Sequence, residues 1–131
     1  VCGHIGLTPQ TATALGGFKA QGRSADKALR LVEDALALQE AGCFLLVLEA
    51  VPEAVARTIT ELLSIPTIGI GASAECDGQI LVLEDMLGLN PWTPKFVKVY
   101  GQLGPMIEDS VRRYAEEVKT RAFPTEDQVY R

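Results

Sequence analysis

The sequence predicts an α/β fold in which parallel strands alternate with helices that pack outside the sheet. Two observations support this prediction. Residues 43–48 form an apolar run without alternation, which is typical of a strand covered on both faces in a parallel sheet. Between such runs, apolar residues recur at helical spacing, so strand and helix units follow one another along the chain.

The first half of the chain divides clearly into such units. A strand is predicted over residues 1–7, followed by a Gly-rich loop over 8–22. A helix begins after Ser24, whose hydroxyl suits an N-cap, and Gly42 is a natural stop for that helix. The apolar run 43–48 then forms the second strand.

A second helix is predicted to begin at Pro52, because the first turn of a helix tolerates a missing N–H. Its buried stripe comprises Val55, Ile59, Leu62 and Leu63. The remaining predicted elements are a strand over 65–71, a loop over 72–78, a helix over 79–87, a short strand over 95–100 and a last helix over 105–119.

The length of the chain fits half of a (β/α)8 TIM barrel. Eight units in about 250 residues imply about 31 residues per unit, so about four units would fill the 131 residues of this chain. A doubly wound open sheet is the structural alternative, although no Gly-x-Gly-x-x-Gly motif follows the first strand. The absence of an initiator Met, and a start that resembles the middle of a strand, predict a fragment of a longer protein.

Composition narrows the classes of partner. With 47% hydrophobic and 22% charged residues, residues 1–131 are expected to belong to one globular domain. A net charge of -5 argues against nucleic acids and anionic membranes as partners. No apolar stretch approaches the roughly 20 residues of a membrane span, so we expect a cytoplasmic protein. Cys2, Cys43 and Cys76 form no CxxC pair, which disfavours disulfides and a zinc site.

Ligands of parallel α/β folds gather at the carboxyl ends of the strands, and this makes Glu49 the first candidate. Directly after an apolar strand, its carboxylate would be partly desolvated and able to exchange a proton near neutrality. The structural alternatives are that Glu49 marks where the strand reaches water, or that it pairs with Lys19. His4, inside the first strand, is either a ligand contact or a hydrogen-bonded core residue.

Other polar and glycine positions are weaker candidates. The glycines of residues 69–72 allow either close approach of a ligand or a sharp turn. Asp77 with Gly78 is typical of a turn, and Asp85 of a charge on a helix surface.

Several sequence blocks resemble a known family. They occur in unbroken order: GHIGLTPQ (3–10), GFK (17–19) with QGR (21–23), LEAVP (48–52), IPTIGIGA (65–72) and CDGQ (76–79). Through these blocks the chain resembles, from Val1 to about Pro124, the ketopantoate hydroxymethyltransferases.

The resemblance implies a (β/α)8 barrel enzyme of pantothenate biosynthesis, of which this chain would be the C-terminal half. Such an enzyme transfers a hydroxymethyl group from 5,10-methylenetetrahydrofolate to 3-methyl-2-oxobutanoate, giving 2-dehydropantoate through an enolate stabilised by Mg²⁺. Glu49 matches the family's catalytic glutamate, taken as the proton acceptor, and His4 matches a histidine beside the bound keto acid. The resemblance further implies a homo-oligomer, often a decamer.

The chain also departs from the family. The family usually has Gly where Ser73 stands and His where Glu84 stands, and its usual tail pattern is absent from residues 126–130. The Mg²⁺ ligands are expected in the N-terminal half, so this chain has no metal ligand of its own and by itself would be inactive. Two alternatives remain: an enzyme of the phosphoenolpyruvate-mutase or isocitrate-lyase type, and a non-catalytic assembly fragment that associates through strand edges and apolar helix faces.

Overall fold

The computed structural model describes residues 1–9, 22 and 24–131. The predicted Gly-rich loop and the proposed Lys19 partner of Glu49 therefore fall mostly or wholly outside the described residues. Two compact units make up the chain, Val1–Leu81 and Val82–Arg131. The predicted single domain over residues 1–131 stays a prediction.

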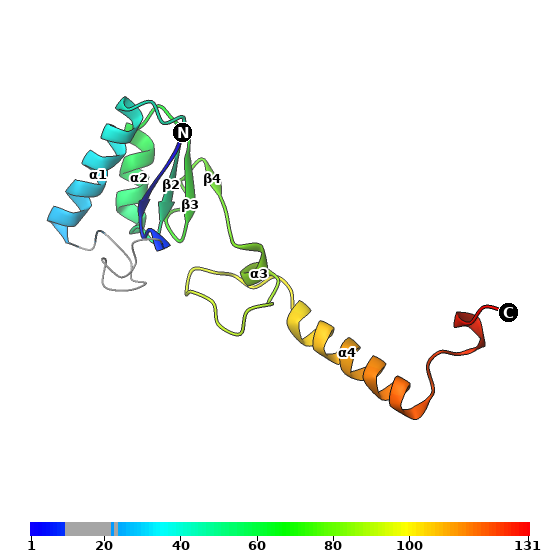
Figure 1. Ribbon diagram of the computed structural model, residues 1–131. Helices are drawn as coiled ribbons and strands as arrows, with labels where there is room; N and C mark the ends of the chain where they lie inside the picture. The colour runs from blue at the N-terminus through cyan, green and yellow to red at the C-terminus, as the bar shows by residue number, and fades with distance from the viewer. Residues whose placement is uncertain (10–21, 23) are drawn as a thin grey trace. The chain divides into compact units, whose positions relative to one another are not determined.

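A four-stranded parallel sheet forms the centre of the first unit (Figure 1). Its strands are β1 (Cys2–Gly6), β2 (Leu45–Glu49), β3 (Thr67–Ile70) and β4 (Gly78–Gln79), and they lie side by side in chain order. The parallel sheet confirms the α/β class and agrees with a segment of the predicted barrel. Closure of a barrel, and a C-terminal place in it, stay predictions.

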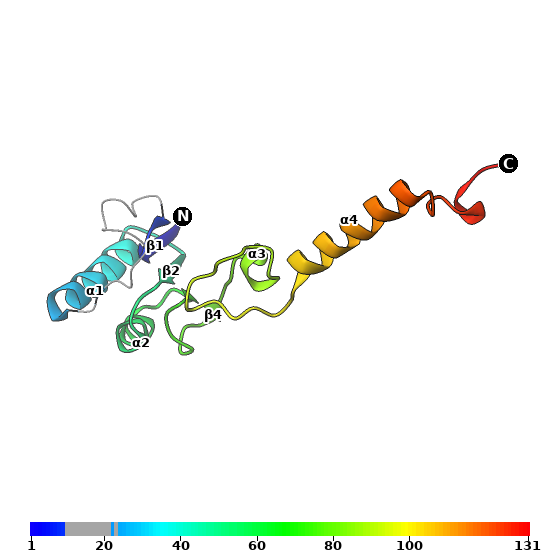
Figure 2. The same ribbon diagram turned by 90° about the horizontal axis from the view of Figure 1, so that it is seen from below.

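Two helices cover one face of this sheet, as Figures 1 and 2 show. They are α1 (Ala25–Glu40) and α2 (Glu53–Leu62), each at the position that the apolar spacing predicted. The Ser24 hydroxyl accepts a hydrogen bond from the Lys27 N–H, which confirms the predicted N-cap. Gly42 follows α1 with φ +93°, a conformation in which a residue without Cβ avoids strain.

The core lies between the helices and that face of the sheet. Leu46 and Leu48 of β2 are fully buried there, against Ala56 and Ile59 of α2 and Ala35 of α1. Burial alternates along β2, with Leu45, Val47 and Glu49 only partly buried. The prediction that this apolar strand is buried on both of its faces is therefore wrong for this chain.

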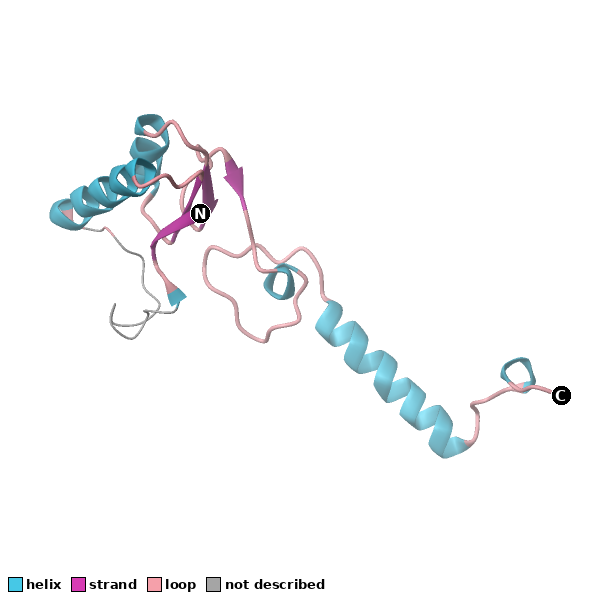
Figure 3. Cartoon of the chain, turned by 45° about the horizontal axis from the view of Figure 1, so that its top comes forward, coloured by secondary structure: helices cyan, strands magenta, loops and turns pink. Residues whose placement is uncertain are grey.

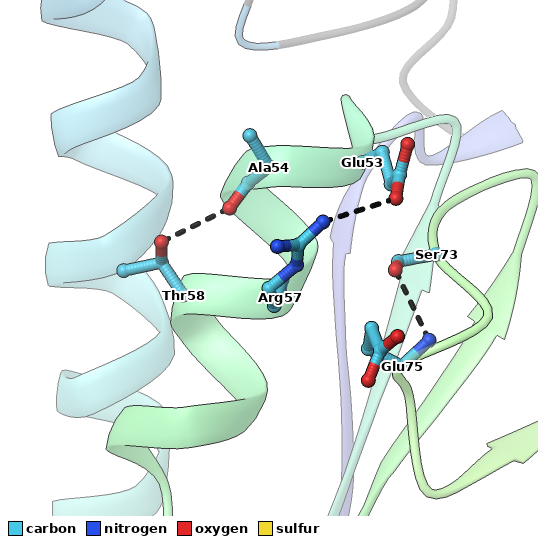
Figure 4. Close-up of polar contacts among 6 residues, drawn as sticks. All are labelled: Glu53, Ala54, Arg57, Thr58, Ser73 and Glu75. Carbon is cyan, nitrogen blue, oxygen red and sulfur yellow. Dashed lines mark hydrogen bonds and ion pairs between the residues drawn. The ribbon is translucent and has the colours of Figure 1, made fainter.

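The buried stripe of α2 also differs from the prediction at one position. Ile59 is buried as expected, and Val55 and Leu63 pack at the margin of the core. Leu62, however, is 53% exposed and does not belong to the buried stripe of α2. Glu53 and Arg57 lie on the outer side of α2 and form an exposed ion pair of 3.2 Å (Figure 4).

The fourth strand is where the sequence prediction failed. Residues 79–87 were predicted as one helix, but Gly78–Gln79 pair with β3 and only Leu83–Met86 form a helix, α3. A carboxylate decides this pairing: Asp77 Oδ2 accepts hydrogen bonds from the Thr67 N–H (2.8 Å) and hydroxyl (3.2 Å). The Ile80 N–H then donates to the carbonyl of Gly69, which extends the contact with β3.

The second unit contains α3, α4 (Leu103–Thr120) and a short 3-10 turn (Glu126–Gln128). The helix predicted over 105–119 is confirmed as α4. The strand predicted over 95–100 is wrong: Figure 3 shows loop between α3 and α4. The N–H groups of Tyr100 and Gly101 donate to the carbonyl of Met86 at the end of α3, so this segment closes on a helix end rather than on a strand.

Helix α4 carries an apolar stripe that is exposed in this chain. The side chains of the stripe are 46% to 63% exposed, and they belong to Met106, Ile107, Val111, Tyr114 and Val118. Within the described part of the chain, no helix has both the length and the apolar character that a membrane span requires.

The bonds of Asp77 lead to a prediction about stability. Replacing Asp77 by Ala removes the acceptor of a buried N–H on Thr67, so we expect a loss of about 1–2 kcal/mol in the free energy of unfolding. Asp77→Asn keeps an acceptor oxygen and should lose less. Chemical denaturation of the full-length protein measures both; equal losses for Ala and Asn would contradict the role assigned to the acceptor.

Candidate active site

His4 and Glu49 lie on the same face of the sheet, opposite to the face that the helices cover. The register pairs His4 with Val47 and Gly6 with Glu49, and side chains of paired residues point to the same side. Because Glu49 is two residues beyond Val47, its side chain emerges next to that of His4. The two residues that the sequence singled out are therefore brought together by the β1–β2 pairing.

The two side chains are in hydrogen-bonding contact. His4 Nε2 lies 3.0 Å from Glu49 Oε2. An ionised carboxylate can only accept hydrogen bonds. When Glu49 is ionised, His4 Nε2 therefore carries a proton and donates the hydrogen bond to Oε2. This contact orients one oxygen of the carboxylate.

Glu49 is well sheltered from solvent. Its side chain is 13% exposed and that of His4 is 32% exposed. The alternative that Glu49 only marks where β2 reaches water does not agree with this burial. Among the described residues His4 is the side-chain partner of Glu49, while Lys19 lies outside them. His4 itself sits in the middle of β1 rather than at its end, and its ring reaches toward the end of β2.

Backbone contacts hold Glu49 at the carboxyl end of β2. Its carbonyl accepts a hydrogen bond of 2.8 Å from the Leu7 N–H, and the following N–H, of Ala50, donates at 2.9 Å to the carbonyl of Ile70. Ala50 has φ +51°, in the left-handed region that residues with a Cβ seldom occupy. No feature of the sequence signals this conformation, because the residue is Ala rather than Gly.

The other candidate residues have structural partners. A Cβ at Gly69 would lie 3.0–3.2 Å from the Gln79 amide and the Cys76 sulfur. The space beside this glycine is therefore filled by side chains of the protein itself. Asp77 is more than a turn residue, since it bonds Thr67 at the start of β3. Its role was missed because the sequence contains no signal for a contact across a loop.

Ser73 and Glu84, which depart from the family pattern, and the weaker candidate Asp85 make local contacts. Ser73 is buried, and its hydroxyl accepts a hydrogen bond from the Glu75 N–H (Figure 4). Its carbonyl accepts a hydrogen bond from the Gln79 side-chain amide. Asp85 accepts from the Asn90 amide, on an exposed surface. Glu84 accepts through its carbonyl from the Leu89 N–H and thereby helps to end α3. The Ser73 contacts shape the loop before β4, and the contacts of Glu84 and Asp85 shape the end of α3.

The described residues do not form a metal site. Within residues 1–9, 22 and 24–131, no three His, Cys, Asp or Glu side chains gather closely enough to hold an ion. The described part of this chain therefore offers no complete set of ligands for Mg²⁺.

Known proteins are similar to this chain over almost all of its length. Residues 1–126 match the family model described as ketopantoate hydroxymethyltransferase. A 3-methyl-2-oxobutanoate hydroxymethyltransferase of Bartonella quintana (strain Toulouse) is 55% identical over 131 residues, which cover 100% of this chain and 48% of that protein. Proteins of the same name from Nitratidesulfovibrio vulgaris, strains DP4 and Hildenborough, are each 59% identical, over 99% of this chain and 43% of theirs. The chain thus spans less than half the length of these relatives, and its predicted C-terminal placement is not confirmed by the matches.

The His4–Glu49 contact should be measurable as an interaction energy. Because the carboxylate is largely buried, we expect a double-mutant cycle with His4→Ala and Glu49→Ala, each of which removes one partner, to give a coupling of about 1 kcal/mol in the free energy of unfolding. The exposed Arg57–Glu53 pair is the control, for which about 0.3 kcal/mol is expected. A His4–Glu49 coupling no larger than that of the control would show that the contact contributes little.

Proposed function

The chain belongs to the ketopantoate hydroxymethyltransferase family, and from this premise we propose that it supplies the proton-transfer pair of an enzyme acting on 3-methyl-2-oxobutanoate. The enzyme would add a hydroxymethyl group to C3 of this keto acid and form 2-dehydropantoate, with 5,10-methylenetetrahydrofolate as donor. The observation that carries the proposal is the 3.0 Å contact between His4 and a sheltered Glu49 on the open face of the sheet.

The reaction needs a base at C3. The hydrogen on C3 is acidified by the neighbouring ketone, and its removal leaves an enolate. In the proposal the Glu49 carboxylate takes this proton, and the electron pair of the broken C–H bond becomes the enolate π bond. The enolate carbon then forms a C–C bond to the one-carbon unit, whose two C–N bonds to the folate break. Water supplies the hydroxyl oxygen. The two nitrogens of the released tetrahydrofolate take up one proton from water and one in place of the proton removed from C3.

The surroundings of Glu49 support its role as the base. The His4 ring donates to Oε2, while Oε1 makes no hydrogen bond to a described residue and can face the substrate. Val47 and Ile70, on the same face of the sheet, are apolar neighbours suited to the two methyl groups of the substrate. A base that is held still and partly desolvated loses little energy to solvent reorganisation when it accepts a proton.

Mg²⁺ belongs to this proposal as a cofactor held by residues beyond the described ones, since those offer no complete set of ligands. The family match favours the transferase over the predicted lyase or mutase alternative.

The role of Glu49 can be tested on the enolisation step alone. In D2O without a one-carbon donor, we expect the full-length enzyme to exchange the C3 hydrogen of 3-methyl-2-oxobutanoate, as followed by NMR. Glu49→Gln should lower this rate by about 100-fold or more, as loss of a general base does. Glu53→Gln, which changes an exposed glutamate on α2, is the matched control and should keep the parent rate. Undiminished exchange in Glu49→Gln would remove this residue from its role.

We also propose that the apolar stripe of α4 is covered by a further copy in a homo-oligomer. The stripe is about half exposed in this chain, and such faces usually meet a protein partner. Val111→Lys in the full-length enzyme should lower the oligomer mass measured by light scattering, with Arg113→Lys as the control on the same helix. An unchanged mass together with a lower stability would place the partner of α4 within the same subunit and refute this proposal.

A further inference from the structure

Two residues with left-handed backbone flank the proposed base on adjacent strands. Gly6 ends β1 with φ +91° and pairs directly with Glu49, while Ala50 follows Glu49 with φ +51°. Both residues therefore turn the chain at the carboxyl ends of their strands. Gly6 lies next to Glu49 on the neighbouring strand, and Ala50 follows Glu49 in the chain.

Gly6 has no space for a side chain. A Cβ built there would overlap the carbonyl oxygen of Glu49 and lie 2.7 Å from a methyl group of Val51. Val51 is enclosed in the core, with 2% of its surface exposed, so a shift of its side chain would disturb the packing there. Because the other overlap is with a backbone oxygen, relieving it requires the backbones of Gly6 and Glu49 to move apart.

The peptide between Glu49 and Ala50 is bonded to both neighbouring strands. Its carbonyl accepts from Leu7 N–H beyond β1, and its N–H donates to the carbonyl of Ile70 on β3. This peptide sets the direction in which the Glu49 side chain leaves β2. A shift of the peptide would therefore change the position of the carboxylate relative to His4.

Ala50 is unusual among the left-handed residues of the described chain. The others are glycines, apart from Arg121, which is exposed at the C-cap of α4. Ala50 is buried, and a Cβ narrows the left-handed region to a small range of φ and ψ, whereas Gly would be free to move through a wide range. Strained residues of this kind persist where the surrounding structure holds them, often beside functional groups.

We propose that Gly6 and Ala50 are positioning residues that together fix the direction of the Glu49 carboxylate. Gly6 lets the backbone of Glu49 approach β1 closely enough for the His4 ring to reach Oε2. Ala50 restricts the turn that follows, so that the Glu49–Ala50 peptide keeps one orientation. This inference rests on the proposed function, because it concerns the same proton acceptor.

The test compares C3 hydrogen exchange by full-length enzymes with matched substitutions. Gly42 provides the control for Gly6: its φ of +93° imposes the same backbone strain, but nothing lies within 4 Å of an added Cβ, and it is remote from Glu49 in the α1–β2 turn. We expect Gly6→Ala to lower kcat by about 10- to 100-fold relative to Gly42→Ala, with KM within about twofold, since displacement of a catalytic group by about 1 Å has effects of this size.

Ala50→Gly is the second variant and introduces no clash, so it does not depend on whether Gly6→Ala folds. It should lower kcat several-fold while thermal unfolding stays close to that of the parent. In the background of Glu49→Gln, neither substitution should lower the residual exchange further, because two changes that act through one group are not additive.

The results separate this inference from the proposed function. Loss of exchange in Glu49→Gln, with parent-like kcat in Ala50→Gly and in a folded Gly6→Ala, would overturn the positioning role alone. Full exchange in Glu49→Gln would overturn the proposed function, and with it the inference. A further loss in the double variants would show that Gly6 and Ala50 act on the fold rather than through Glu49.

Discussion

The pairing of β1 with β2 places the two polar side chains on which the candidate site depends. In this register His4 opposes Val47, and Glu49 opposes Gly6. A shift of one residue would turn the Glu49 side chain toward the helices, because successive side chains of a strand alternate between faces. Burial opposes such a slip: Leu46 and Leu48 would leave the core if Glu49 entered it.

The residues buried on the helix-covered face therefore determine which side chains lie on the open face of the sheet. Ile5, Leu46, Leu48 and Thr67 are buried toward α1 and α2, and each fixes the direction of its neighbour along the strand. At about 25 cal/mol per Å² of apolar surface, this burial outweighs the contribution of a single hydrogen bond such as that between His4 and Glu49. The pair is thus positioned by the core, and its own contact contributes only about 1 kcal/mol to the stability of the fold.

The end of β2 combines regular pairing with a locally unfavourable backbone. Ala50 occupies the left-handed region at a cost of about 1 kcal/mol, which the hydrogen bonds and the burial of Val51 can offset. A similar logic holds at the start of β3, where Asp77 satisfies the Thr67 N–H and brings β4 into the sheet. In both places hydrogen bonds between residues distant in sequence hold the path of the chain.

The sequence by itself determined those elements whose signals are local. Ser24 and Gly42 bound α1 through capping and turn chemistry, the apolar run before Glu49 predicts β2, and the spacing of α4 predicts a helix. The motif resemblance identified Glu49 and His4 before their contact was visible. Only the tertiary structure decided that these two side chains touch, that Ala50 is left-handed, and that residues 78–79 form a strand while 95–100 do not. Each of these depends on bonds between residues distant in sequence, and periodicity carries no information about such bonds.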